Sequence, residues 1–151
     1  VFKNGHWYYG DADGYTHIGW LLDASGCWYY LDTDGRMATG WRSVNGKWYY
    51  LDADGRMATG WRSVNGKWYY LNADGDMAAG WIFVNGRWYY LNADGDMAIG
   101  WILVNGVWYY LNPMAGVLDP GGNPIPEGAM YVSAVTPDGY HVGASGALIG
   151  R

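Results

Sequence analysis

The sequence has little of what several common kinds of protein depend on. Its single cysteine, Cys27, excludes an intramolecular disulfide framework and a cysteine-rich metal site. Only 15% of the 151 residues are charged and the net charge is −5, which argues against binding nucleic acid. No apolar run approaches the ~20 residues that cross a bilayer, so we expect no membrane insertion. Because 50% of the residues are hydrophobic, we do not expect charge-driven disorder either.

Aromatic residues and glycine take the place of these missing types. Tryptophan (11), tyrosine (15) and glycine (25) make up a third of the chain. They recur with a period of 20 residues, because residues 40–59 read GWRSVNGKWYYLDADGRMAT and residues 60–79 and 80–99 are close copies. An earlier copy carries one extra residue in its turn. Five Gly-Trp starts follow one another, at Trp20, Trp41, Trp61, Trp81 and Trp101.

The two ends of the chain differ from the repeats. Residues 4–7 align with residues 45–48, so we expect the chain to begin inside a repeat that is truncated at the N-terminus. The repeats then cover residues 1–112. Residues 113–151 contain no tryptophan and four of the five prolines. We interpret this second region as a Pro/Gly loop over 113–128 and a C-terminal capping hairpin around the turn at 136–139.

Each repeat contains the signals of a β-hairpin. An Asn-Gly pair lies between β-favouring runs at 45–46, 65–66, 85–86 and 105–106, and Asn-Gly supplies the two φ > 0 residues of a type I′ turn. The later Asp-Gly pairs make a second turn into the next repeat. No stretch shows helical periodicity. Since a lone hairpin is only marginally stable, the sequence predicts an all-β fold, a β-solenoid of stacked two-stranded hairpins.

The two-residue turn also fixes which side chains share a face. With Asn45-Gly46 at the tip, Trp41 pairs with Tyr50 and Ser43 with Trp48. One face therefore carries two tryptophans and Tyr50, and the other carries Tyr49. Two indoles form only a wall, so a third side has to come from the next repeat, for which we consider Met57 and Tyr70.

The simplest interpretation of these aromatic residues is a packed core. However, tryptophan is costly to bury completely, and aliphatic residues would fill a repeat core more simply. Two tryptophans and a tyrosine in every repeat instead indicate surface cavities walled by π faces. Such cavities hold quaternary ammonium groups through cation–π attraction of ~0.5–2 kcal/mol per ring.

The repeat GWxxxNGxWYYLxxDGxMxTG resembles the choline-binding (cell-wall-binding) repeat of Gram-positive surface proteins, phage lysins and cell-wall hydrolases. The resemblance covers residues 1–112 and implies hairpins stacked as a left-handed superhelix, with choline held between two Trp of one repeat and a Tyr and Met. It implies four choline-binding sets: Trp20, Trp28, Met37 and Tyr50; Trp41, Trp48, Met57 and Tyr70; Trp61, Trp68, Met77 and Tyr90; and Trp81, Trp88, Met97 and Tyr110.

The resemblance implies a non-catalytic module. Its partner would be choline or phosphocholine on the (lipo)teichoic acids of the cell wall, it would need no cofactor, and its protein would be secreted and associated with the cell wall. Two possibilities stay open: a catalytic domain elsewhere in a longer chain, and a homodimer through the C-terminal region. A fifth site at Trp101 and Trp108 also stays open, with Met114 and Tyr131 as the candidates for its missing walls.

The sequence gives weaker support to a calcium site, another metal site or an enzyme. The Asp-Gly segments fail the spacing of a calcium loop, because the twelfth position counted from Asp52 is Ser63 and not glutamate. His6, His17 and His141 share no metal-ligand spacing, so we predict no metal. The sequence shows no identifiable pair of acid/base carboxylates and no nucleophile–base arrangement, so we predict no enzyme in this segment. The main rival function is a glucan- or carbohydrate-binding repeat, since sugars also stack on Trp and Tyr. A structural spacer is the third alternative.

Overall fold

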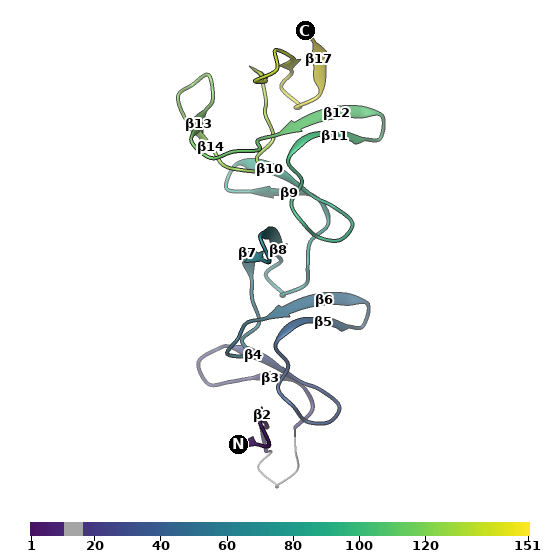
Figure 1. Ribbon diagram of the computed structural model, residues 1–151, viewed down its shortest axis with the longest axis vertical. Helices are drawn as coiled ribbons and strands as arrows, with labels where there is room; N and C mark the ends of the chain where they lie inside the picture. The colour runs from purple at the N-terminus through teal and green to yellow at the C-terminus, as the bar shows by residue number, and fades with distance from the viewer. Residues whose placement is uncertain (11–16) are drawn as a thin grey trace. The chain divides into compact units, whose positions relative to one another are not determined.

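The computed structural model describes residues 1–10 and 17–151, and every regular element in them is a β-strand (Figure 1). This confirms the all-β fold of repeated two-stranded hairpins. The strands pair in sequence order as β1 (Phe2–Lys3) with β2 (His6–Trp7), β3 (Gly19–Leu22) with β4 (Trp28–Leu31), β5 (Gly40–Val44) with β6 (Lys47–Leu51), β7 (Gly60–Val64) with β8 (Lys67–Leu71), β9 (Gly80–Val84) with β10 (Arg87–Leu91), and β11 (Gly100–Val104) with β12 (Val107–Leu111).

The turn chemistry and the register agree with the sequence. Asn45 and Gly46 have φ of 53° and 80°, and the other Asn-Gly pairs of the repeats are also left-handed. In the β5–β6 hairpin Trp41 pairs with Tyr50 and Ser43 with Trp48, as the two-residue turn requires. The alternation of side chains across each hairpin is therefore confirmed.

The C-terminal region is more regular than expected. Strands β13 (Val117–Leu118) and β14 (Pro124–Ile125) form a short hairpin within the segment expected to be a loop. Strands β15 (Ala134–Val135), β16 (His141–Val142) and β17 (Leu148–Gly150) form a three-stranded sheet instead of one hairpin. The third strand follows from an extra tight turn, in which the Gly146 N–H donates to the Gly143 carbonyl over 2.9 Å. Strand β17 lies against β12.

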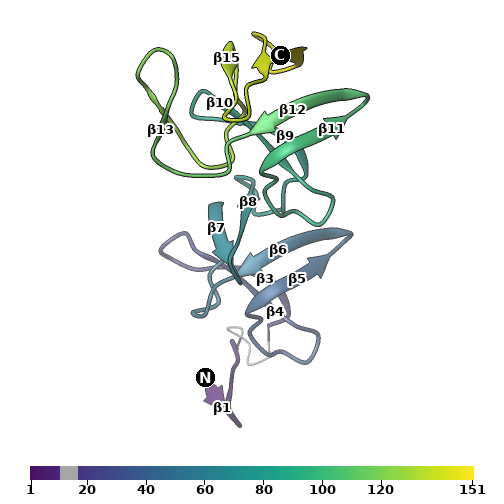
Figure 2. The same cartoon turned by 45° about the horizontal axis from the view of Figure 1, so that its top comes forward.

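The chain divides into two compact units, and the division falls within strands β7 and β8. Unit 1 comprises residues 1–63 and 70–77, and unit 2 comprises residues 64–69 and 78–151. Within each unit the tips of successive hairpins point in different directions, as β3–β4 and β5–β6 show in unit 1 (Figure 2). Successive hairpins of a unit are therefore rotated relative to one another.

Backbone hydrogen bonds join each hairpin to the one before it. The Met57 N–H, which follows the β5–β6 hairpin, donates to the Trp28 carbonyl of β3–β4 over 2.8 Å. In unit 2 the Met97 N–H donates to the Trp68 carbonyl over 2.7 Å. The methionine of each repeat is thus fixed beside the second tryptophan of the preceding hairpin.

The same methionines explain the glycines of the Asp-Gly turns. Gly75 has φ of +91°, and a Cβ placed on it would overlap the Met57 sulfur. Both the backbone conformation and the methionine therefore require glycine at this position. The same pairing joins Gly55 to Met37, Gly128 to Met97 and Gly146 to Met130.

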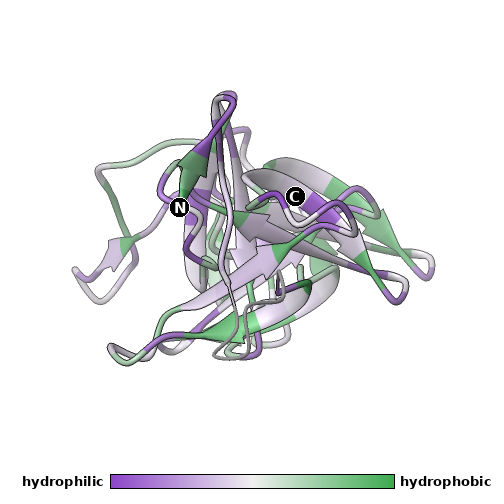
Figure 3. Ribbon diagram, turned by 90° about the horizontal axis from the view of Figure 1, so that it is seen from below, coloured by the Kyte–Doolittle hydropathy of each residue, from purple (hydrophilic) through white to green (hydrophobic). Residues whose placement is uncertain are grey.

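The core consists of aliphatic residues. The leucine that ends each WYYL strand is buried, with 3% of its surface exposed at Leu31 and 0% at the four later positions. The alanine after the methionine of each repeat, at positions 38, 58, 78 and 98, is also buried, whereas the second tryptophan of each pair is 39–46% exposed. In Figure 3 much of the strand ribbon is correspondingly pale, and the strongly hydrophobic colour is confined to short stretches. A large part of the second tryptophan's surface is therefore left outside the packing between repeats.

Candidate functional site

Each regular hairpin presents two indoles on one face. In β3–β4 the ring centroids of Trp20 and Trp28 lie 6.4 Å apart with their planes at 88°. In unit 2 the rings of Trp81 and Trp88 reproduce this arrangement at 6.4 Å and 87°. The repeated sequence thus builds the same two-walled corner in both units.

A tyrosine of the following hairpin closes this corner. The Tyr49 ring lies 4.9 Å from Trp20 at 69°, and the Tyr109 ring lies 5.0 Å from Trp81 at 75°. In unit 1 the result is a cavity of about 300 Å³, lined by Trp20, Trp28, Tyr49, Met57, Ala73 and Asp74.

The structure places the expected closing tyrosines against a tryptophan of their own hairpin. Tyr50 lies 5.1 Å from Trp41, its cross-strand partner, on the indole face of its own hairpin. Tyr70, Tyr90 and Tyr110 likewise contact Trp61, Trp81 and Trp101, at 5.1, 5.0 and 5.0 Å. When identical hairpins are stacked, the indole face of one meets the opposite face of the next, and that face carries the first tyrosine of WYY.

The methionine beside each tryptophan pair comes from one repeat later than expected. The backbone N–H of each methionine donates to a tryptophan carbonyl: Met37 to Trp7, Met57 to Trp28, Met77 to Trp48 and Met97 to Trp68. Each expected set therefore names a methionine that belongs with the preceding hairpin. The Trp88 carbonyl accepts from the Met130 N–H, over 2.8 Å. The structure brings together the expected tryptophan pairs Trp20/Trp28 and Trp81/Trp88, but the tyrosine and methionine beside each pair differ from those expected. Trp61 and Trp68 belong to different units.

The last tryptophan pair is closed by the C-terminal sheet. Neither candidate drawn from the sequence fills this role, because the Tyr131 ring contacts Tyr110 at 5.0 Å and Met114 is 59% exposed. The ring beside Trp101 is Tyr140, at 5.7 Å and 83°. A cavity of about 350 Å³ results, lined by Trp101, Trp108, Asp138, Tyr140 and Leu148.

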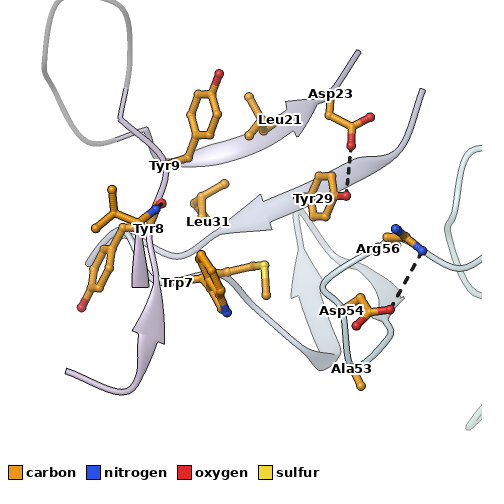
Figure 4. A pocket seen from close by; sticks show the side chains of 12 residues that line it. Trp7, Tyr8, Tyr9, Leu21, Asp23, Tyr29, Leu31, Ala53, Asp54 and Arg56 are labelled. Atoms are coloured by element: carbon orange, nitrogen blue, oxygen red, sulfur yellow. Dashed lines mark hydrogen bonds and ion pairs between the residues drawn. The ribbon is translucent and has the colours of Figure 1, made fainter. Parts of the chain in front are cut away.

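A larger cavity of about 650 Å³ lies at the beginning of unit 1 (Figure 4). Its walls include Trp7, Tyr29 and Met37, which correspond in the repeat to Trp28, Tyr49 and Met57. Asp54 and Arg56 form an ion pair of 3.9 Å at its edge. The combination of a first WYY tyrosine and a methionine therefore occurs twice in unit 1, beside Trp7 and beside Trp28.

A turn carboxylate beside this cavity is held strongly in its charged form. The Cys27 N–H and the Ser25 hydroxyl donate to Asp23, and they lower its pKa to about 2. The Tyr29 hydroxyl donates to the same carboxylate over 3.0 Å. Asp23 thereby connects the turn of β3–β4 to a ring of the cavity wall.

The cavities of the two units share one chemical character. Across residues 1–10 and 17–151 no group of three His, Cys, Asp or Glu side chains could hold a metal ion. The same part of the chain contains no helix long and apolar enough to cross a membrane. What recurs is a partly exposed aromatic corner with a thioether beside it, which suits a small organic cation.

Comparison with known proteins agrees with this arrangement. A family pattern described as "Choline-binding repeat" matches residues 38–80 and 78–118, and one described as "Putative cell wall binding repeat" matches residues 18–37. Comparison with curated protein sequences gives no match.

Solved structures of similar proteins come from Streptococcus pneumoniae. Choline binding protein F is 38% identical, with a TM-score of 0.70 over 99% of this chain and 56% of that one. The protein CbpJ gives 38% identity and a TM-score of 0.70 over 99% and 57%. The modular autolysin LytC, solved with a synthetic peptidoglycan ligand, is 30% identical. Its TM-score is 0.69, over 93% of this chain and 30% of LytC.

These proteins define a class of all-β repeat modules that bind the cell wall. The chain belongs to the choline-binding repeat family. It spans a little over half the length of choline binding protein F and CbpJ. The repeat region is a binding module and not a catalytic domain.

Proposed function

We propose that each aromatic cavity binds one choline. Two tryptophans of one hairpin form two walls, and the first WYY tyrosine and the methionine of the next repeat complete the cavity. The observation that carries this proposal is the Trp20, Trp28, Tyr49 and Met57 cavity, with indoles 6.4 Å apart and a third ring 4.9 Å from Trp20. In unit 2 the corresponding set is Trp81, Trp88, Tyr109 and Met130.

The chemistry of these walls favours a quaternary ammonium ion. Three ring faces attract a cation that has no hydrogen to donate, and the methionine thioether packs against its methyl groups. Trp28 keeps 40% of its surface exposed while Leu31 and Leu51 form the core, so the indole is available to a ligand without unfolding the repeat.

The biological role that follows is anchoring to phosphocholine on the teichoic acids of a bacterial cell wall, by a secreted protein. One three-ring cavity binds choline at about the millimolar level, equivalent to about −4 kcal/mol. Several cavities on one chain that engage a repetitive polymer raise the local ligand concentration, and tight attachment follows from this multivalency.

Isothermal titration calorimetry with choline chloride tests the proposal, with short glucans as the comparison ligand. We expect saturable binding of choline in the millimolar range and none of the glucans. Glucan binding without choline binding would instead support a carbohydrate-binding module. A protein that binds neither would be a structural spacer.

A pair of variants ties the binding to one cavity. Trp28→Ala should lower the number of bound choline molecules by one, because it removes a wall of the Trp20 cavity. Ile99→Ala is the matched control, since Ile99 is exposed and lines neither the Trp20 nor the Trp101 cavity. Equal stoichiometry in both variants would contradict the assignment of the cavity.

A further inference from the structure

The cavity beside Trp101 and Trp108 is built differently from those between regular hairpins. Its other walls are Asp138, Tyr140 and Leu148, which come from the C-terminal sheet and its turn. These three residues lie outside the residues matched by the family pattern, which end at 118. The family pattern therefore includes two walls of this cavity, Trp101 and Trp108, and does not include the three residues that complete it.

A fixed carboxylate belongs to this cavity. Asp138 Oδ2 accepts a hydrogen bond from Trp101 Nε1 over 3.0 Å, and the Thr136 hydroxyl donates to Oδ1. The Thr136 hydroxyl, followed by the Trp101 indole, lowers the pKa of Asp138 below its ordinary value. The carboxylate is therefore charged at neutral pH, and its orientation toward the indole is set by two donors.

The tyrosine of this cavity, Tyr140, is in contact with the side chain of an arginine, Arg151. The guanidinium carbon of Arg151 lies 4.7 Å from the centroid of the Tyr140 ring, a cation–π contact. Its Nη2 also donates to the Asp138 backbone carbonyl over 3.4 Å. Arg151 is not one of the cavity's lining residues, so the space between Tyr140 and the two indoles is open to a ligand.

We propose that this cavity is a separate binding site for organic ammonium ions, closed by the C-terminal sheet, with Asp138 as its anionic wall. The proposal rests on the proposed choline-binding function and extends it to a cavity that no repeat completes. The π faces of Trp101, Trp108 and Tyr140 surround the methyl groups of a quaternary ammonium ion, and Asp138 attracts its charge. A neutral ligand of the same shape gains nothing from the carboxylate.

Site-resolved NMR on the full chain tests this proposal. The indole N–H signals of Trp28 and Trp108 are assigned with Trp28→Phe and Trp108→Phe variants and followed during titration with choline chloride. Both signals should shift saturably. The neutral isostere 3,3-dimethylbutan-1-ol should shift the Trp108 signal much less at the same concentrations.

Three charge variants test the role of Asp138. Asp138→Asn retains an acceptor for the Trp101 indole and removes the charge, so choline should bind at Trp108 about two- to fivefold more weakly, the range expected for one exposed ionic partner. Asp119→Asn makes the same change in charge at a residue that does not line the cavity and should leave binding at Trp108 unchanged. Arg151→Gln removes a competing positive charge and should not weaken it.

The outcomes separate this proposal from the general function. If Trp28 responds to choline and Trp108 does not, the cap cavity is not a site and the proposed function stands. If Trp108 responds equally in the wild type and Asp138→Asn, the carboxylate has no role and the proposal is wrong. If neither signal responds, the choline-binding function itself fails.

Discussion

The Trp20/Trp28 cavity and the Trp101/Trp108 cavity begin from the same hairpin face and are closed by different segments. The first receives Tyr49 at 4.9 Å from the next repeat, and the second receives Tyr140 at 5.7 Å from the C-terminal sheet. Leu148 lines the second cavity where a methionine lines the first. A hairpin therefore prepares two walls by its own sequence, and any segment that delivers one ring in the right place can complete the cavity.

The largest expected effect concerns the buried leucines, which occur in each of the two units. Leu51→Ala should lower the free energy of unfolding by about 2–5 kcal/mol, because it leaves a void at a residue with 0% of its surface exposed. Leu103→Ala removes the same side chain from an exposed position and should change stability by less than about 0.5 kcal/mol. Denaturant titrations followed by circular dichroism measure both. Similar losses in the two variants would show that the leucines that end the WYYL strands do not form the core.

Methionine–glycine packing should be equally important in the repeats and in the cap. Gly75→Ala and Gly146→Ala each place a methyl group where a methionine sulfur lies and also strain a left-handed residue, so each should cost about 1–3 kcal/mol or more. Gly46→Ala keeps the backbone strain, with φ of +80°, but meets no atom within 4 Å and should cost less. Thermal unfolding of the three variants gives the comparison. Equal losses would mean that strain alone requires these glycines.

The closing tyrosine can be identified directly. Tyr49→Leu should weaken choline binding at the Trp28 indole by roughly five- to thirtyfold, corresponding to the loss of about 1–2 kcal/mol of cation–π attraction. Tyr50→Leu should leave that indole's response nearly unchanged, because Tyr50 packs on Trp41. Tyr140→Leu should weaken choline binding at the Trp108 indole to the same extent as Tyr49→Leu weakens it at the Trp28 indole. The opposite ranking of Tyr49→Leu and Tyr50→Leu would restore the grouping expected from the sequence.

The smallest expected effect is a pH dependence at the β3–β4 turn. The pKa of Asp23 is lowered to about 2 in the folded chain, so its ionised form stabilises the turn at neutral pH. This contribution is complete above the ordinary pKa of 3.8 and is lost as the pH falls from there to about 2. Melting temperatures of the wild type and Asp23→Asn should therefore differ at pH 6 and converge near pH 2. A constant difference across this range would contradict the assigned pKa.

Most of the fold follows from local rules in the sequence. Asn45-Gly46 determines the turn, the turn determines that Trp41 pairs with Tyr50, and alternation then places Tyr49 on the other face. The 20-residue period supplies the repetition. These steps depend only on neighbouring residues, so they could be predicted from the sequence alone.

The site could be predicted only in part, because its closure depends on how hairpins stack. The tryptophan pairs were predictable, whereas Tyr50 and Met37 were expected where the structure has Tyr49 and Met57. The missing argument is geometric: opposite faces meet in a stack of identical units, which favours the first tyrosine. Tyr140 and Asp138 carry no comparable signal, since they lie more than 30 residues from Trp101 in a segment without the repeat.

The most direct test of the account is a crystal structure of the chain soaked in choline at a concentration that saturates the calorimetric signal. We predict density for a trimethylammonium group between the Trp20 and Trp28 indoles, with the Tyr49 ring as the third wall and Met57 beside it. Choline bound against Tyr50 instead, or a Trp20/Trp28 corner without ligand in crystals that bind choline elsewhere, would contradict the central claim.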